Sequence, residues 1–268
     1  MEEGTLNIEG VDISFTRRGK GAPMLLLHGY PLDRTIWEAV AAMLEDEFDL
    51  IIPDLRGFGS SGVMEADRSI LGYARDLAEL MKRLKIRKAD IVGHSMGGYI
   101  ALAFAREFRR MTNGLGLIAS QVVADTPERK AGRQETARQV LEQGVGIVAD
   151  SMAAKLSPNA GIQATVRTLI GQQRPLGLAV ALEAMAGRPD STDVLRSFNS
   201  PAVIVHGDAD ELIPVERARE MKALVPSAHY LELPHVGHMP MMENPAAVSE
   251  ALRFLEARQR RGVTLLAD

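Results

Sequence analysis

Short apolar runs alternate with amphipathic segments along most of the chain. Runs typical of buried strands are expected at residues 23–28, 48–55, 88–94, 114–120, 201–207 and 228–233. Segments with the spacing of an amphipathic helix are expected at 34–45, 69–84, 96–107, 215–224 and 246–259. At the N-terminus, 5–10 and 11–19 predict a strand hairpin that turns at Glu9–Gly10. Because strands alternate with helices, the sequence predicts an α/β fold with a mostly parallel sheet covered on both faces.

Residues 121–197 interrupt this alternation and contain no convincing strand. Glycine and proline divide them into several expected helices, with breaks at Gly144, Gly146, Pro158, Gly171 and Pro175. A loop of this length without structure of its own would be unusual in a compact domain. We therefore expect a helical insertion at 121–197 between two parts of one core, 1–120 and 198–268. Its apolar residues are expected to be mostly core, with some lining a pocket: Leu141, Val145, Ile147, Met152 and Leu156.

The amino-acid composition limits which classes of function are expected. The chain has 268 residues, 46% of them hydrophobic, which suits one large domain with a real core. A net charge of −4 gives no electrostatic case for a nucleic-acid or membrane partner. There is no cysteine, so disulfides and thiol chemistry are excluded. The N-terminus is acidic and polar and does not resemble a signal peptide, so a cytoplasmic location is expected.

One serine stands inside a glycine cluster between a predicted strand and a predicted helix. Gly93-His94-Ser95-Met96-Gly97 matches G-x-S-x-G in the strand–turn–helix context that a nucleophile elbow requires. Side chains two residues before and after the serine would crowd each other, so glycine is expected at both positions. The alternative is a glycine-rich turn whose serine caps the helix.

A serine nucleophile needs a base, and the base needs an orienting acid. With this type of elbow, the acid and then the histidine follow the serine in the chain. His238 is the preferred base because it lies in the loop before the last helix, and His235 in the same loop is the reserve candidate. The remaining histidines precede the expected acid or lie within a predicted strand: His28, His94, His206 and His229.

The acid is expected just after the strand at 201–207. Asp210 is best placed, two residues into the loop. Asp208 would more naturally close the turn, and Glu211 is more typical of a solvated side chain. His235, His238 and nearby Glu243 could also suggest a metal site, but a histidine of a catalytic triad with a neighbour is the better interpretation, so no metal is expected.

A second glycine motif offers a rival interpretation. Residues 57–62, GFGSSG, fit the dinucleotide-binding pattern G-x-G-x-x-G, and Asp76 lies roughly where a ribose-binding acid would be sought. The third glycine should open a helix, whereas the expected helix here begins only at Ser69. These glycines are therefore expected to be turn residues, and no nucleotide cofactor is predicted.

Five blocks of sequence, in order, resemble the α/β-hydrolases, close to bacterial carboxylesterases, enol-lactonases and cofactor-free haloperoxidases. The blocks span nearly the whole chain: LLLHGYPLDRTIW, IIPDLRGFGSSG, VGHSMGGYIALAFA, VIVHGDADELIP and VGHMPMMENP. The resemblance implies Ser95 as nucleophile, Asp210 as acid and His238 as base. It also implies an oxyanion hole formed by the backbone N–H groups of Tyr30 and Met96, and a cap formed by the helical insertion.

The implied function is hydrolysis of carboxylic esters through an acyl-enzyme, without a cofactor. Relatives that open epoxides or remove halogens use aspartate at the elbow, so serine argues against those reactions. Because aromatic residues are scarce in the insertion, short to medium acyl chains are expected. Enol-lactone hydrolysis of the 3-oxoadipate enol-lactonase type and a small-molecule receptor built on a hydrolase fold are the alternatives. The expected partner is a small ester or lactone, and the expected state a monomer or small homo-oligomer.

Overall fold

The central feature of the fold is one twisted sheet in which six neighbouring strands are parallel. The computed structural model describes residues 1–264, with side chains through Glu256, so the last four residues of the expected core lie outside the described part. Within that part, eight strands pair in the order β1-β2-β4-β3-β5-β6-β7-β8. The strands are β1 (Glu2–Ile8), β2 (Val11–Arg18), β3 (Ala22–Leu27), β4 (Phe48–Pro53), β5 (Ala89–His94), β6 (Thr112–Ile118), β7 (Ala202–Gly207) and β8 (His229–Leu233). Only the pairs β1–β2 and β2–β4 are antiparallel, which confirms the predicted α/β class.

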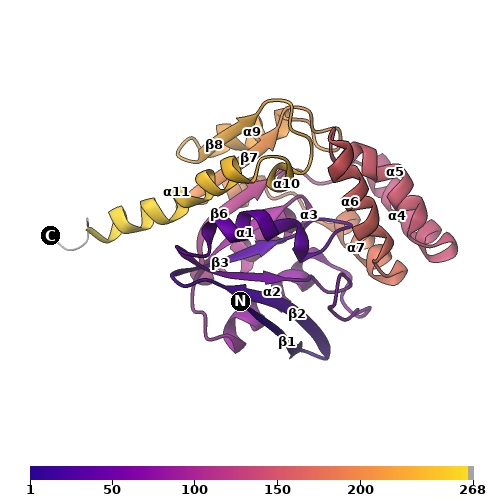
Figure 1. Cartoon of the computed structure of the whole chain (residues 1–268), viewed down its shortest axis with the longest axis horizontal. Coiled ribbons are helices and arrows are strands. Elements are labelled where there is room, and N and C mark those ends of the chain that lie inside the picture. Colours follow the sequence, from indigo (N-terminus) through magenta and orange to yellow (C-terminus); the bar gives the residue numbers. More distant parts are fainter. Residues whose placement is uncertain (265–268) are drawn as a thin grey trace.

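Helices cover both faces of this sheet (Figure 1). On one face α1 (Glu38–Leu44) packs against α11 (Pro245–Thr264). On the other, contacts run in sequence through α2 (Ile70–Arg83), α3 (Met96–Glu107), α8 (Thr192–Arg196) and α9 (Glu216–Leu224). The remaining short helices are η1 (Arg34–Trp37), η2 (Arg109–Met111) and α10 (Pro240–Glu243). With helices on both faces, β5 is buried along its whole length, as expected for a central parallel strand.

Local signals agree with most expected element ends. The hairpin turns through Glu9 and Gly10, whose φ angles are +50° and +93°. Ser69 caps α2 by accepting a hydrogen bond from the Gly72 N–H (3.0 Å). The segment expected as one helix at 34–45 begins instead as a 3₁₀ turn before α1. That turn starts because the Asp33 side chain accepts from the Thr35 N–H.

The loop that carries the second glycine motif lacks the strand–turn–helix geometry of a dinucleotide-binding motif. Gly57 and Gly59 are turn residues with φ of +87° and +49°, and no helix begins between this motif and Ile70. Asp76 is buried and paired with Arg56 (2.5 Å), so its carboxylate is already occupied. The loop therefore lacks both the helix start and the free acid that the dinucleotide interpretation requires.

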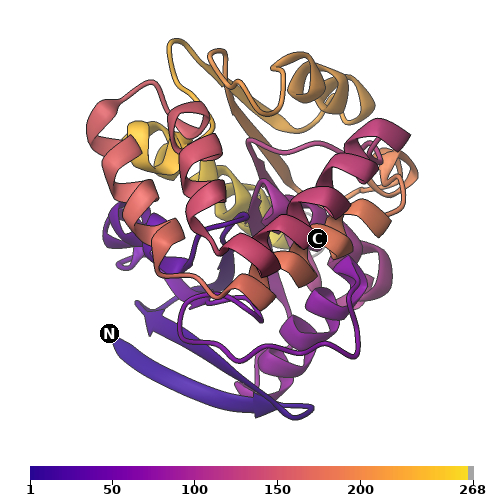
Figure 2. The ribbon, with the colours of Figure 1, turned by 90° about the vertical axis from the view of Figure 1, so that its right-hand side faces the viewer.

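Five helices connect β6 to β7. They are α4 (Pro127–Gln143), α5 (Gly146–Leu156), α6 (Ala160–Gly171), α7 (Pro175–Gly187) and α8, and the first four form the layer facing the viewer in Figure 2. The expected breaks fall at the ends of these helices or between them, and α4 ends at Gly144, which has φ +85°. Leu141 is not a core residue as expected, because its position on α4 leaves it 54% exposed. No helix among the described residues is both long enough and apolar enough to cross a membrane.

The helix layer rests on the sheet half of the molecule through a backbone contact. A Cβ atom on Gly177 of α7 would lie 1.9 Å from the carbonyl oxygen of Gly57, in the loop after β4. A Cβ on Gly57 would in turn lie 2.9 Å from the Gly177 Cα. Only two glycines allow α7 to approach this loop so closely.

We expect Gly177→Ala to destabilise the fold by about 1–3 kcal/mol, because the new methyl group forces α7 away from the loop. Gly132→Ala is the matched control, since Gly132 is also within a helix and its Cβ would meet nothing within 4 Å. The control should gain stability, by up to about 1 kcal/mol, from helix propensity. Urea unfolding of both variants measures the change in the free energy of unfolding relative to the wild type. Equal changes of the same sign in the two variants would contradict the close contact.

Candidate active site

The turn between β5 and α3 displays Ser95 in a strained backbone conformation. Its φ and ψ angles are +52° and −113°, a region that residues with side chains rarely adopt. A Cβ on Gly93 would lie 2.1 Å from the backbone of Gly97, which confirms the expected crowding across the serine. A Cβ on Gly97 would lie 2.5 Å from the carbonyl oxygen of Leu27 in β3. The glycines therefore let the start of α3 approach the sheet while Ser95 stands at the carboxyl end of β5.

Neighbouring strands hold this turn in place. The Ser95 N–H donates to the Ile118 carbonyl at the end of β6 (2.9 Å), and the Ser120 hydroxyl donates to the Ser95 carbonyl (2.9 Å). A side chain on Gly98 would collide with Ser120 Oγ, at 2.3 Å. The third glycine of the cluster thus makes room for a serine 22 positions later, a contact that no local pattern reveals.

Asp210 and His238 form a buried pair. The His238 Nδ1–H donates to Asp210 Oδ2 at 2.7 Å, and both side chains are almost fully buried. The other carboxylate oxygen accepts from the backbone N–H groups of Leu212 (2.8 Å) and Ile213 (3.0 Å). Burial alone would raise the pKa of Asp210, but its interactions with His238 and His206 outweigh burial and hold the pKa well below its ordinary value. Asp210 is therefore ionised at neutral pH.

His206, at the end of β7, is a further neighbour of this carboxylate. Its Nε2 lies 3.2 Å from Asp210 Oδ2 and 2.8 Å from the Ile213 carbonyl oxygen. Because a carbonyl accepts only from a protonated nitrogen, Nε2 carries the hydrogen and can donate to both. Sequence reasoning set His206 aside because it precedes the acid, and so missed this contact.

The backbone of His238 is fixed from two sides. Its N–H donates to the Leu156 carbonyl at the end of α5 (2.9 Å), and its carbonyl accepts from His94 Nε2 (2.8 Å). His94 is fully buried, and burial lowers its pKa well below the ordinary value, so the ring stays neutral. The adjacent N–H groups of Gly237 and Met239 both donate to Glu243 (2.9 and 3.2 Å). The loop that carries His238 is thus held by the sheet, by α5 and by α10, the helix that directly follows it.

The alternative candidates for the base and the acid do not join this pair. His235 is exposed, and its backbone N–H donates to Asp208 Oδ1 (2.6 Å), so Asp208 closes the turn as expected. Glu211 is also exposed. Among residues 1–256, whose side chains the structure describes, no cluster of histidine, cysteine, aspartate or glutamate is arranged to hold a metal ion. The structure thus brings Asp210 together with His238 rather than with His235.

Met96 and Tyr30 belong to two segments that adjoin the turn at Ser95. Met96 is the first residue of α3, and the N–H groups of a first helical turn have no acceptor within the helix. Tyr30 follows β3 in the loop beside the elbow, and a Cβ on the preceding Gly29 would lie 2.6 Å from the His94 ring. The peptide bond from Tyr30 to Pro31 is cis. These are the two positions for which the family resemblance implies an oxyanion hole.

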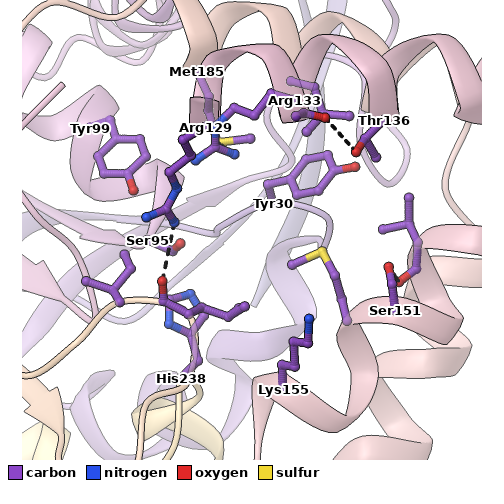
Figure 3. A pocket seen from close by; sticks show the side chains of 16 residues that line it. Tyr30, Ser95, Tyr99, Arg129, Arg133, Thr136, Ser151, Lys155, Met185 and His238 are labelled. Atoms are coloured by element: carbon purple, nitrogen blue, oxygen red, sulfur yellow. Dashed lines mark hydrogen bonds between the residues drawn. The ribbon is translucent and has the colours of Figure 1, made fainter. Parts of the chain in front are cut away.

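A cavity of about 360 Å³ opens over Ser95 and His238. Figure 3 shows these two residues at one side of it and Thr136 and Ser151, on α4 and α5, at the other. Apolar side chains cover part of its wall: Val148, Met152, Leu182, Met185, Leu212 and Ile213. Of the insertion residues expected to be core or pocket, Met152 is the one that lines this cavity, and Leu156 is fully buried.

Known proteins similar to this chain include an esterase, an enol-lactonase and a lipase. An esterase from Thermogutta terrifontis, solved with malate bound, is 37% identical with a TM-score of 0.90 and covers 94% of this chain and 97% of its own. The enol-lactonase from Burkholderia xenovorans LB400 has a TM-score of 0.86 at 22% identity, over 94% of this chain and 100% of its own, and shares the fold. Lipase 3 from Moraxella sp. (strain TA144) is 28% identical over 83% of this chain and 73% of its own length.

The sequence also matches a family profile described as the alpha/beta hydrolase family, over residues 24–251. That match includes the elbow at Ser95, the Asp210–His238 pair and all the helices between β6 and β7. Together with the similarity to the Thermogutta esterase, it shows that this chain belongs to the alpha/beta hydrolase family of enzymes.

Proposed function

We propose that this protein hydrolyses carboxylic esters of short to medium acyl chain, with Ser95 as nucleophile, His238 as base and Asp210 as acid. The observation that carries the proposal is the hydrogen bond from His238 Nδ1 to the ionised Asp210. It fixes the proton on Nδ1 and leaves Nε2 as the acceptor for a serine hydroxyl. Ser95 and His238 line the same cavity, which supports a transfer between them.

The reaction proceeds in two halves. Ser95 Oγ attacks the ester carbonyl while His238 takes its proton, and Asp210 stabilises the imidazolium that forms. The alcohol then leaves with that proton, and an acyl group remains on Ser95. Water, activated by the same histidine, adds to the acyl carbon and releases the carboxylic acid and the free serine. No step requires a cofactor.

The oxyanion of each tetrahedral intermediate is assigned to the N–H groups of Tyr30 and Met96. Met96 begins α3, and the positive end of that helix dipole favours a developing negative charge. Because both donors belong to the backbone, their positions depend on the glycines of the elbow and on the loop after β3.

The cavity supports a small acyl group. Its volume of about 360 Å³ is near the lower end of the roughly 300–1,000 Å³ typical of small-molecule pockets. We assign residues 121–197 the role of a cap, since α4, α5 and α7 supply most of the wall that faces Ser95. An enol-lactone offers the same carbonyl chemistry, so lactones belong in the same substrate panel as esters.

Release of p-nitrophenol from p-nitrophenyl butyrate is the first test. We expect clear turnover by the wild type and a loss of about 10⁴-fold or more in kcat for Ser95→Ala, because the acyl-enzyme cannot form. Equal rates for both proteins would rule out Ser95 as nucleophile. Negligible turnover of every ester and lactone by a folded wild type would favour the receptor alternative.

The two loop histidines provide a matched comparison. We expect His238→Asn to lose about 10⁴-fold in kcat, since the base is removed. His235→Asn should retain nearly full activity, because His235 is exposed and asparagine tolerates its φ of +60°. Steady-state kinetics on p-nitrophenyl butyrate distinguish the two, and the opposite ranking would reassign the base.

Asp210 should also leave a signature in the pH dependence of stability. Its folded-state pKa is depressed, so its contribution to the free energy of unfolding is fully present above about pH 4, its ordinary value, and is lost as the pH falls further. Below about pH 4 the wild type should lose up to about 1.4 kcal/mol per pH unit relative to Asp210→Asn. Urea unfolding of both proteins between pH 6 and 3 measures this, and parallel pH profiles would contradict the depressed pKa.

A further inference from the structure

Three positive side chains line the cavity that Ser95 and His238 share. Arg129 and Arg133 come from α4 and Lys155 from α5, and Figure 3 shows all three around the same space. Among the described residues that line this cavity, there is no aspartate or glutamate. A pocket meant only for neutral esters has no need of three cations near its nucleophile.

The nearest carboxylate cannot neutralise this charge. Asp125 Oδ2 lies 2.6 Å from Arg133 Nε, while Oδ1 lies 2.9 Å from Arg188 Nη1 and 3.6 Å from Arg129 Nε. Three guanidinium groups therefore share one buried carboxylate, which leaves two positive charges uncompensated. Lys155 adds another, since it has no ion pair within the described residues.

Unused hydrogen-bond donors point into the same space. The Tyr30 side chain is 5% exposed, and its hydroxyl has no hydrogen-bond partner among the described residues. In Figure 3 it is directed away from Ser95, toward Thr136 on α4. Burial raises the pKa of Tyr30, so the hydroxyl keeps its proton and can donate. Arg133 uses Nε and Nη1 on Asp125 and Met185, and Nη2 has no partner there.

Neighbouring hydroxyl groups do not meet this need. Thr136 donates to the Gly132 carbonyl (2.9 Å) and Ser151 to the Val148 carbonyl (3.2 Å), and neither hydroxyl oxygen lies within hydrogen-bond distance of the Tyr30 hydroxyl. The groups left without a partner around this part of the cavity are donors, and most of them are positive. A buried donor without an acceptor is costly, and a carboxylate, with two acceptor oxygens and one negative charge, complements this set.

We propose that the natural substrates are half-esters of dicarboxylic acids, whose free carboxylate is bound by Arg129, Arg133, Lys155 and the Tyr30 hydroxyl. This inference rests on the proposed esterase function and names its substrate class. We assign the carboxylate to the acyl portion, because the acyl group stays bound through both halves of the reaction. Hydrolysis then consumes one water, breaks the ester C–O bond and yields an alcohol and a dicarboxylate.

Matched methyl esters test the proposal. Monomethyl succinate, glutarate and adipate are compared with methyl butyrate, valerate and hexanoate, with acid release followed by titration at constant pH. We expect the wild type to prefer at least one half-ester by about 10-fold or more in kcat/KM, the range for a charge-assisted hydrogen bond. This preference should fall as salt is raised, since ionic screening weakens the attraction.

Variants of the cations identify the subsite. The double variant Arg129→Gln/Lys155→Gln should lose most of the preference, by about 10-fold or more, through a higher KM for the half-ester. Lys130→Gln is the matched control, since Lys130 lies on α4 beside Arg129 but does not line the cavity. The control should keep the wild-type ratio. A ratio unchanged in the double variant would overturn the proposed subsite.

A binding measurement separates this proposal from the esterase assignment. Glutarate and adipate are titrated calorimetrically into Ser95→Ala and into Ser95→Ala with both cation substitutions. Binding by the first protein and at least 10-fold weaker binding by the second support the subsite even without turnover. Hydrolysis of neutral esters with no half-ester preference and no dicarboxylate binding would leave the esterase in place and remove the subsite.

Discussion

The close approach of two backbone segments at Gly93 and Gly97 is the constraint on which the site depends. With no side chain at either position, α3 can start directly against β3 and β5, and Ser95 must adopt a positive φ to connect them. The same approach brings the first N–H groups of α3 to the carboxyl ends of the central strands, where the loop that carries Tyr30 also begins. One packing contact thus positions the Ser95 hydroxyl and both proposed oxyanion donors. Packing of the surrounding sheet offsets the unfavourable free energy of the strained Ser95 backbone.

The second half of the site is organised around the main chain of His238. His94, beside the nucleophile, donates to its carbonyl, and the end of α5 accepts from its N–H. The imidazole itself is oriented by Asp210, whose other oxygen is held by two backbone N–H groups. Groups from the sheet, the loop after β7 and the helix layer therefore converge on a single residue, which explains why it is buried within a loop.

Sequence patterns predicted the parts of this protein that depend on local order. Buried strands, amphipathic helices, the Ser69 cap and the glycine elbow each follow from residues within one short window, and their expected limits lie within a few residues of those observed. Contacts between distant positions were not predictable in this way. His94 and His238 are 144 positions apart, and the sharing of Asp125 by three arginines depends on how α4 and α7 meet. The prediction that Leu141 is a core residue was wrong, because the presence of an apolar residue does not show which face of its helix is covered in the fold.

The hydrogen bond from His238 to the Leu156 carbonyl has a practical consequence for protein engineering. Grafting a different helical segment between β6 and β7 is an obvious way to change the pocket, since loops and insertions vary more readily than the sheet. In this protein such a graft would also remove an acceptor from the main chain of the histidine. A successful chimera must therefore bring its own carbonyl to the same point, so a recombination boundary placed after the end of α5 is safer than one placed before it.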